Sequence, residues 1–164
     1  MKRALHILVV VAAACLGMTA CGDSSCYDNG NSLPLATFYL DGKQQSISGL
    51  TIMGIGSPGD SLLANNASLG ESYLPLRASV GSTSYLLSRR FTVDTVSTDI
   101  RDTLTFYYDA VPFFHSVECG TMFNFDIKKV VYTTHGIDSV IMLTTLITNS
   151  PTPALRVYFN ASNP

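Results

Sequence analysis

Residues 102–109 read DTLTFYYD, and their side chains alternate between two chemical kinds. In an extended strand, Leu104, Phe106 and Tyr108 fall on one face. The opposite face carries Thr103, Thr105 and Tyr107. A period of two with one apolar face is typical of a β-strand that packs against a core. This stretch therefore indicates an all-β fold.

The same pattern continues along the chain. Residues 35–40 (LATFYL) and 123–129 (FNFDIKK) alternate in the same way, and no window beyond residue 20 has sustained helical spacing. Segments 139–148 and 155–159 are rich in β-branched and aromatic residues. Turn residues separate the runs at DGK (41–43), SPGD (57–60), Gly81, Ala110–Pro112, HG (135–136) and SPTP (150–153). We therefore expect one domain at 34–164, an immunoglobulin-like antiparallel β-sandwich of about seven to nine strands.

The first twenty residues have the pattern of an export signal. A basic start, MKR, precedes an apolar run from Leu5 to Ala20, and the chain then becomes polar. That run is short for a spanning helix, which needs about 20 apolar residues. MTA before Cys21 resembles the lipobox of bacterial lipoproteins, which implies that Cys21 is lipidated. The alternative is secretion with an unlipidated N-terminus. We predict a lipoprotein signal peptide at 1–20 and a lipid-anchored tether at 21–33.

The remaining cysteines point to a disulfide. Removal of the signal leaves Cys21, Cys26 and Cys119. If Cys21 carries lipid, an even pair remains in an oxidising compartment, where disulfides persist. A Cys26–Cys119 bond would close a loop of about 90 residues, for which chain-entropy estimates give roughly 4 to 5 kcal/mol. The alternative is two free buried thiols.

The charge of the chain argues against several partners. The whole sequence has a net charge of −2, and loss of Lys2 and Arg3 with the signal leaves 8 of its 10 basic residues against 12 acidic ones. Such a chain has no electrostatic footprint for nucleic acid and no polybasic patch for anionic lipid. The expected contact with a membrane is the lipid anchor itself.

A glycine motif at 54–59, GIGSPG, has the Gly-x-Gly-x-x-Gly spacing that binds a dinucleotide pyrophosphate. In that fold, a long helix begins at the third glycine. Here Gly59 is followed by DSLLANNASLGESYLPL, which has the pattern of strand, loop and strand, and Pro58 lies inside the motif. We predict a turn between two strands and no nucleotide binding.

Candidate metal and catalytic groups are few. His115 and Glu118 are three residues apart, so on a strand they point to opposite faces. Asp94, Asp99 and Asp102 resemble a calcium cluster in composition but lack the spacing of a known site, and we expect a solvated connection. No Gly-x-Ser-x-Gly elbow is present. We expect no metal, no cofactor and no enzymatic activity.

Five segments, taken in order, resemble one family. They are GIGSPGDSLL (54–63), SYLPL (72–76), DTLTFYYDAVPFFHSVECG (102–120), HGIDSVIM (135–142) and LRVYF (155–159). They are similar to the Bacteroidota lipoprotein family catalogued as domain of unknown function 6452, most specifically at SVECG around Cys119. The resemblance implies a lipid-anchored, β-rich envelope protein with no established activity. It also points to an outer-membrane barrel protein as a partner.

A triplet of Asp, Ser or Thr, and an apolar residue occurs four times. Its hydroxyl residues are Ser61, Thr95, Thr103 and Ser139. The triplet resembles the acceptor motif for O-linked glycosylation of exported Bacteroidota proteins, and modification requires an exposed hydroxyl. The alternative is that Asp ends a turn and the hydroxyl residue opens the next strand. Both interpretations stand on the sequence alone.

Three classes of function follow from these observations. The favoured one is a non-enzymatic, lipid-anchored envelope protein that binds a protein partner at the outer membrane, on either of its faces. The alternative is a glycan- or small-ligand-binding module that uses exposed aromatic rings in 106–115. A hydrolase is the third class, and the sequence contains no assembled catalytic constellation for it.

Overall fold

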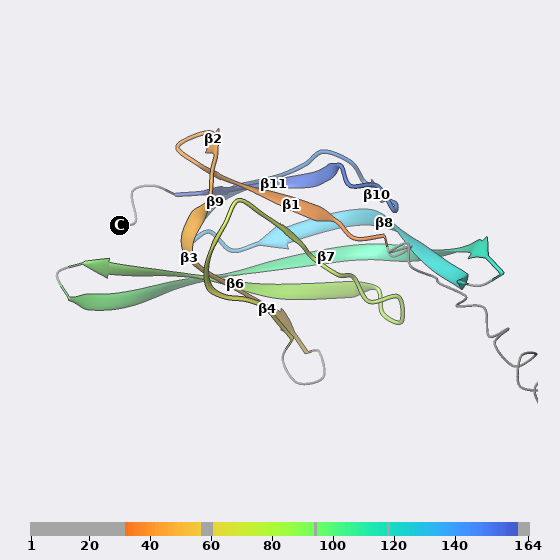
Figure 1. The fold of residues 1–164 in the computed structure, drawn as a ribbon, viewed down its shortest axis with the longest axis horizontal. Coiled ribbons are helices and arrows are strands. Elements are labelled where there is room, and N and C mark those ends of the chain that lie inside the picture. The colour runs from red at the N-terminus through yellow and green to blue at the C-terminus, as the bar shows by residue number, and fades with distance from the viewer. Residues whose placement is uncertain (1–31, 57–60, 94, 118, 161–164) are drawn as a thin grey trace, which may run out of the picture.

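The alternating segments form two stacked β-sheets, with the smaller sheet lying across one face of the larger (Figure 1). The computed structural model describes residues 32–56, 61–93, 95–117 and 119–160. The strands are β1 (Leu35–Leu40), β2 (Lys43–Gln44), β3 (Ile47–Ile55), β4 (Leu62–Leu69), β5 (Glu71–Tyr73), β6 (Ser82–Val93), β7 (Val96–Ser116), β8 (Gly120–Tyr132), β9 (Ile137–Met142), β10 (Leu146–Ile147) and β11 (Pro153–Phe159). The prediction of an all-β fold is confirmed.

The two sheets differ in how their strands run. The 6-stranded sheet has the order β10-β8-β7-β6-β3-β4, and each neighbouring pair in it is antiparallel. The 5-stranded sheet has the order β2-β1-β11-β9, with β5 also paired to β1. Strands β1 and β11 are parallel, so the prediction of a purely antiparallel fold is wrong for this pair. Parallel strands need a long crossover, and here the chain between β1 and β11 provides it.

The immunoglobulin-like part of the prediction is not confirmed. Strands β6, β7 and β8 follow one another along the chain and lie side by side in one sheet. In the seven-stranded immunoglobulin arrangement, no three consecutive strands share a sheet. The central part of this larger sheet is therefore a meander of long hairpins.

The core lies between the two sheets. Leu104 and Phe106 of β7 are fully buried and Tyr108 is 3% exposed, which confirms the inward face predicted for this strand. Phe38 of β1 and Val157 of β11 meet them from the smaller sheet. Burying one such side chain contributes roughly 1.5 to 3 kcal/mol, so this face of β7 joins the two layers.

Strand β7 does not turn at Ala110–Pro112, so the turn predicted there is wrong. The amide of Tyr108 donates to the carbonyl oxygen of Gly81 at 3.0 Å, and beyond that point β7 has no paired strand on this side among the described residues. Amide directions alternate along a strand, so the nitrogen of Pro112, four residues on, lies at the same open edge. Because proline has no N–H group, it interrupts no sheet hydrogen bond there.

Two hairpins extend from the central part of β7 in opposite directions (Figure 1). The β6–β7 hairpin carries an ion pair between Arg90 and Asp99 at 2.8 Å. The β7–β8 hairpin carries Phe114 and Val117, which are 69% and 86% exposed. The β6–β7 hairpin therefore presents a surface ion pair, and the β7–β8 hairpin presents an exposed phenylalanine and an exposed valine.

The glycine motif begins in β3, whose last two residues are Gly54 and Ile55, and continues toward β4. Strand β4 follows it and pairs antiparallel with β3, so a strand follows the motif as predicted. Gly56 is described, whereas residues 57–60 lie outside the described residues. The absence of nucleotide binding stays a prediction.

Gly49 gives a test of this packing. Its φ is +71°, and a Cβ atom there would fall against the backbone carbonyl oxygen of Arg90 in β6. Gly42 has the same φ of +71° but open space around it. We expect Gly42→Ala to cost about 1 to 2 kcal/mol, the left-handed backbone alone, and Gly49→Ala to cost about 2 to 3 kcal/mol because β6 must also shift. Urea unfolding of the two variants makes the comparison, and equal losses would contradict the close approach of β3 and β6.

Candidate functional site

A groove opens at the end of the molecule that carries the β7–β8 hairpin. It has a volume of about 400 Å³ and lies between the loop at residues 74–78 and the first half of β8. The apolar side chains that line it include Leu33, Leu76, Met122, Phe123 and Phe125. Surfaces of this kind bind apolar ligand groups, because transfer of such groups out of water is favourable.

Buried hydroxyl groups hold the loop that forms one wall. The Tyr108 hydroxyl donates to the Arg77 carbonyl oxygen at 2.8 Å and lies 3.0 Å from the Arg77 amide nitrogen, which donates to it. Thr83 Oγ1 lies 2.6 Å from the same hydroxyl. The Tyr85 hydroxyl donates to the carbonyl oxygen of Pro75. The wall is thus fixed to β6 and β7 before any ligand arrives.

The Tyr85 hydroxyl remains a donor across the accessible pH range. Burial raises the pKa of this phenol well above its ordinary value, and the neighbouring Tyr108 raises it further. A protonated hydroxyl can keep its hydrogen bond to the Pro75 carbonyl. The groove wall therefore does not depend on pH near neutrality.

The first described residues lie against β8 beside the groove. The Ser32 hydroxyl donates to Oδ1 of Asn124 at 2.7 Å, and Ser32 is 1% exposed. Ser32 and Leu33 both line the groove. The predicted tether at 21–33 therefore reaches the domain at its hairpin end, although residues 21–31 lie outside the described residues.

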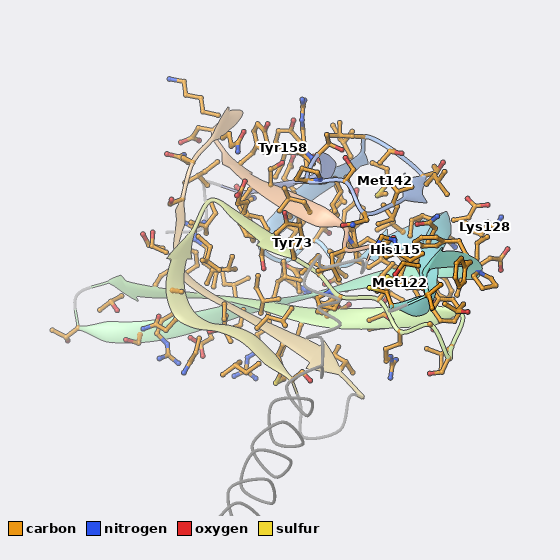
Figure 2. The ribbon with its side chains drawn as sticks, turned by 45° about the vertical axis from the view of Figure 1, so that its right-hand side comes forward. Tyr73, His115, Met122, Lys128, Met142 and Tyr158 are labelled. Carbon is orange, nitrogen blue, oxygen red and sulfur yellow. The ribbon has the colours of Figure 1, made fainter. Side chains whose placement is uncertain are left out.

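The hairpin continues past the groove. Phe114 pairs with Thr121, a groove residue, so the exposed Phe114 ring lies next to the groove's outer end. Figure 2 shows His115 and Met122 together at this end of the molecule. The groove and the exposed Phe114 ring are thus at the same end of the molecule.

Asp102 forms a second polar site, at the start of the inward face of β7. Its carboxylate accepts hydrogen bonds from the Thr133 hydroxyl at 2.6 Å and from the amides of His135, Gly136 and Ile137 at 2.8, 2.7 and 2.8 Å. The side chain is 3% exposed. One carboxylate therefore fixes the connection between β8 and β9 to β7.

Two opposing effects act on the pKa of Asp102. Burial raises it, but the hydrogen bonds from the Thr133 hydroxyl and the three backbone amides together outweigh burial and hold the pKa below its ordinary value. Each of these donors prefers the charged carboxylate. Asp102 is therefore ionised in the folded protein at neutral pH.

The expectation of a solvated connection at these aspartates is wrong for Asp102. Asp99, three residues away, points to the opposite face and pairs with Arg90. Asp94 lies outside the described residues. The alternation along β7 could have predicted this burial. Asp102 is two and four residues from the buried Leu104 and Phe106, so it lies on the same face of the strand.

The histidines do not meet in one cleft. His135 Nδ1 lies 3.1 Å from Asp102 Oδ1, while His115 lies thirteen residues further along β7. At about 3.3 Å per strand residue, the two are roughly 40 Å apart. Within residues 32–56, 61–93, 95–117 and 119–160, no group of three or more His, Cys, Asp or Glu residues could hold a metal ion. Glu118 lies outside this set.

The exposed aromatic rings of β7 are not arranged as one platform. Phe106 and Tyr108 are buried, whereas Tyr107 and Phe114 are 45% and 69% exposed. Tyr107 and Phe114 are seven residues apart, so they face opposite sides of the strand, at a distance of about 23 Å along it. A single sugar cannot stack on both rings.

The four candidate glycosylation hydroxyls differ in exposure. Ser61 and Thr95 are exposed, whereas Thr103 and Ser139 are half-buried. In the third triplet, the aspartate is Asp102, whose structural contacts account for its presence. Ser61 and Thr95 are therefore the sites where a glycan would meet least steric hindrance.

Cys119 lies at the free end of the β7–β8 hairpin. Its amide donates to the Ser116 hydroxyl at 3.1 Å, and β8 begins at the next residue. Cys21 and Cys26 lie outside the described residues, so lipidation and the Cys26–Cys119 bond stay predictions.

These features define a class of protein: an all-β domain of two sheets with an apolar groove and an apolar hairpin at one end. The chain belongs to a family of unknown function, DUF6452, which matches residues 49–159. The match includes β8 and the loop that form the groove, and the whole β7–β8 hairpin. Searches of curated proteins and of solved structures returned no match. Across the described residues, no helix has the length and apolar character of a membrane span.

Proposed function

We propose that this protein is a Bacteroidota envelope lipoprotein, anchored at Cys21, whose groove binds an apolar segment of a partner protein at the outer membrane. Its role is binding rather than catalysis. The observation that carries this proposal is the apolar groove beside Ser32, one wall of which is held in place by hydrogen bonds in the absence of a ligand. The export signal, the lipobox-like MTA before Cys21 and the family resemblance support the location.

The fixed wall favours binding, because the loop loses little conformational entropy when a ligand enters the groove. Tyr85 and Tyr108 already hold the loop at Pro75 and Arg77. A site that is formed in advance avoids the entropy loss of ordering its own side chains and loops. Its volume of about 400 Å³ is in the range of ligand sites, roughly 300 to 1,000 Å³, and suits a few apolar side chains of an extended segment.

The position of the groove favours a partner at the membrane. Ser32 is eleven positions after Cys21 in the sequence, and a fully extended chain between them spans at most about 40 Å. The groove therefore stays within that reach of the acyl chains. An outer-membrane barrel protein, the partner that the resemblance points to, would present its own segments at this distance.

The glycan alternative has less support. Sugar sites combine stacked aromatic rings with polar groups that fix the hydroxyls. The exposed rings Tyr107 and Phe114 face opposite sides of β7, and the groove lining is mainly apolar. A protein segment fits these surfaces better than a glycan does.

Photo-cross-linking in living cells tests this function. We expect a photoreactive phenylalanine analogue at Met122, in the groove, to form an adduct whose partner peptide is an apolar segment of one envelope protein. Leu76→Asp should remove that adduct, because it places a charge on the opposite wall. The same analogue at Tyr107, an exposed position about 20 Å from Met122 along the paired strands β7 and β8, is the control.

The pattern across these positions decides the outcome. An adduct at Met122 that is absent at Tyr107 and lost with Leu76→Asp supports the proposal. Equal adducts at Met122 and Tyr107, or no adduct at Met122 in protein present at its normal level, would contradict it.

A further inference from the structure

Apolar side chains at the tip of the β7–β8 hairpin are exposed, and no other described segment packs over them. Phe114 and Val117 are 69% and 86% exposed. Burial of a valine or phenylalanine side chain is favourable by roughly 1.5 to 3 kcal/mol, so leaving these groups in water gives up stabilisation. Two apolar side chains this exposed at one hairpin end make that end a candidate contact surface.

The tip lies at the end of the molecule that the tether reaches. Ser32 bonds to Asn124, which is four residues from the start of β8 at Gly120. At about 3.3 Å per residue, the tether therefore joins the domain roughly 13 Å from the hairpin end. The tether that would carry the lipid anchor therefore joins the domain at the end that carries the apolar tip.

The predicted disulfide would bring the two closer. Cys119 lies at the tip, and Cys26 is only five positions after Cys21 in the sequence. With Cys26 bonded to Cys119, the acylated residue would stay within about 24 Å of Cys119, about 18 Å for the extended chain and about 6 Å for the bond. A tip held at this distance from the acyl chains is adjacent to the bilayer surface.

We infer that the β7–β8 hairpin tip inserts into the lipid surface that carries the anchor, as a second membrane contact. The contact is apolar, because residues 110–127 contain no Lys or Arg to attract anionic headgroups. His115 and Glu118 in the same segment favour the headgroup region over the hydrocarbon centre. The contact would set the orientation of the domain, with the groove next to the membrane surface.

This inference rests on the proposed lipid anchor, and the test separates the two. The full lipidated protein is isolated with Phe114→Trp and mixed with phosphatidylcholine vesicles that contain brominated acyl chains. The chain has no tryptophan of its own, so the introduced indole is the sole reporter. Val96→Trp is the matched control, since Val96 is 65% exposed on the hairpin at the opposite end. Val117→Trp repeats the test at a second tip position.

We expect the protein to float with the vesicles and both tip indoles to show blue-shifted emission and loss of fluorescence in brominated lipid. The indole at position 96 should keep the emission of an aqueous site. Flotation without quenching at 114 and 117 would overturn the inference and leave the anchor intact. Quenching of the indole at position 96 equal to that at 114 and 117 would contradict the orientation in which the β7–β8 hairpin end faces the bilayer. Failure to float would overturn both the anchor and the inference.

Discussion

Replacing Asp102 with alanine is expected to lower the free energy of unfolding by about 3 to 5 kcal/mol. The substitution removes the acceptor of the Thr133 hydroxyl and of the amides of His135, Gly136 and Ile137. The amides of Gly136 and Ile137 are buried, so water cannot replace the carboxylate without rearrangement. A domain of this size is stable by roughly 5 to 15 kcal/mol, so the loss is a large share of the total.

The matched control is Asp109→Ala on the same strand. Asp109 is 71% exposed and forms a surface ion pair with Lys128 at 3.3 Å. Surface ion pairs contribute roughly 0 to 1 kcal/mol, so we expect a small change. Urea unfolding at neutral pH measures both variants. Equal stability of Asp102→Ala and wild type would contradict the structural role of this carboxylate.

Because of Asp102, the free energy of unfolding should decrease as the pH falls below about 4. The fold holds the pKa of Asp102 below its ordinary value, so the unfolded chain takes up the proton first as the pH falls. The stabilisation is fully present above the unfolded pKa of about 3.9 and is lost as the pH falls through the lower, folded pKa. Asp102→Asn should lack this component, and its stability should fall less steeply than that of wild type below about pH 4.

Loss of the predicted Cys26–Cys119 bond is the second large effect. We expect Cys119→Ser to lose about 2 to 5 kcal/mol, mainly because the unfolded chain gains freedom when a loop of about 90 residues opens. The strands should persist at low temperature, because the faces of β7 and β8 still have a core to bury.

A double-mutant cycle is the control for this prediction. Cys26→Ser, Cys119→Ser and the double variant should lose the same free energy, because each removes the same bond. Losses that add, or a Cys119→Ser variant as stable as wild type, would contradict a stabilising disulfide.

The period of two predicted much of this fold because it reports which face of a strand is buried. It identified β1 at its observed bounds and the inward face of β7. The prediction failed at Ala110–Pro112, because these turn-forming residues were expected to end the strand although the alternation continues through them. A proline at an open edge interrupts no pairing, and the sequence does not show which edge is open.

The candidate site was harder to predict, because its parts come together only through the topology. The groove combines Leu33, the loop at Leu76 and β8 at Met122, which are far apart in the chain. Their juxtaposition depends on the order of strands in the two sheets. The burial of Asp102, by contrast, was predictable, because it lies on the same face of β7 as Leu104. It was missed because a charged residue is expected at the surface.

The central claim is that a lipid anchor at Cys21 and a bond from Cys26 to Cys119 hold the hairpin end at the membrane. A tryptic digest of protein from the envelope, made without reductant, tests both parts in one mass spectrum. Trypsin should release residues 21–43 and 102–128, because no Lys or Arg interrupts either stretch. We predict one species that joins these two peptides and carries acyl mass, and that separates on reduction with the lipid on 21–43. Separate peptides with free thiols at Cys26 and Cys119, or an unacylated Cys21, would contradict the account.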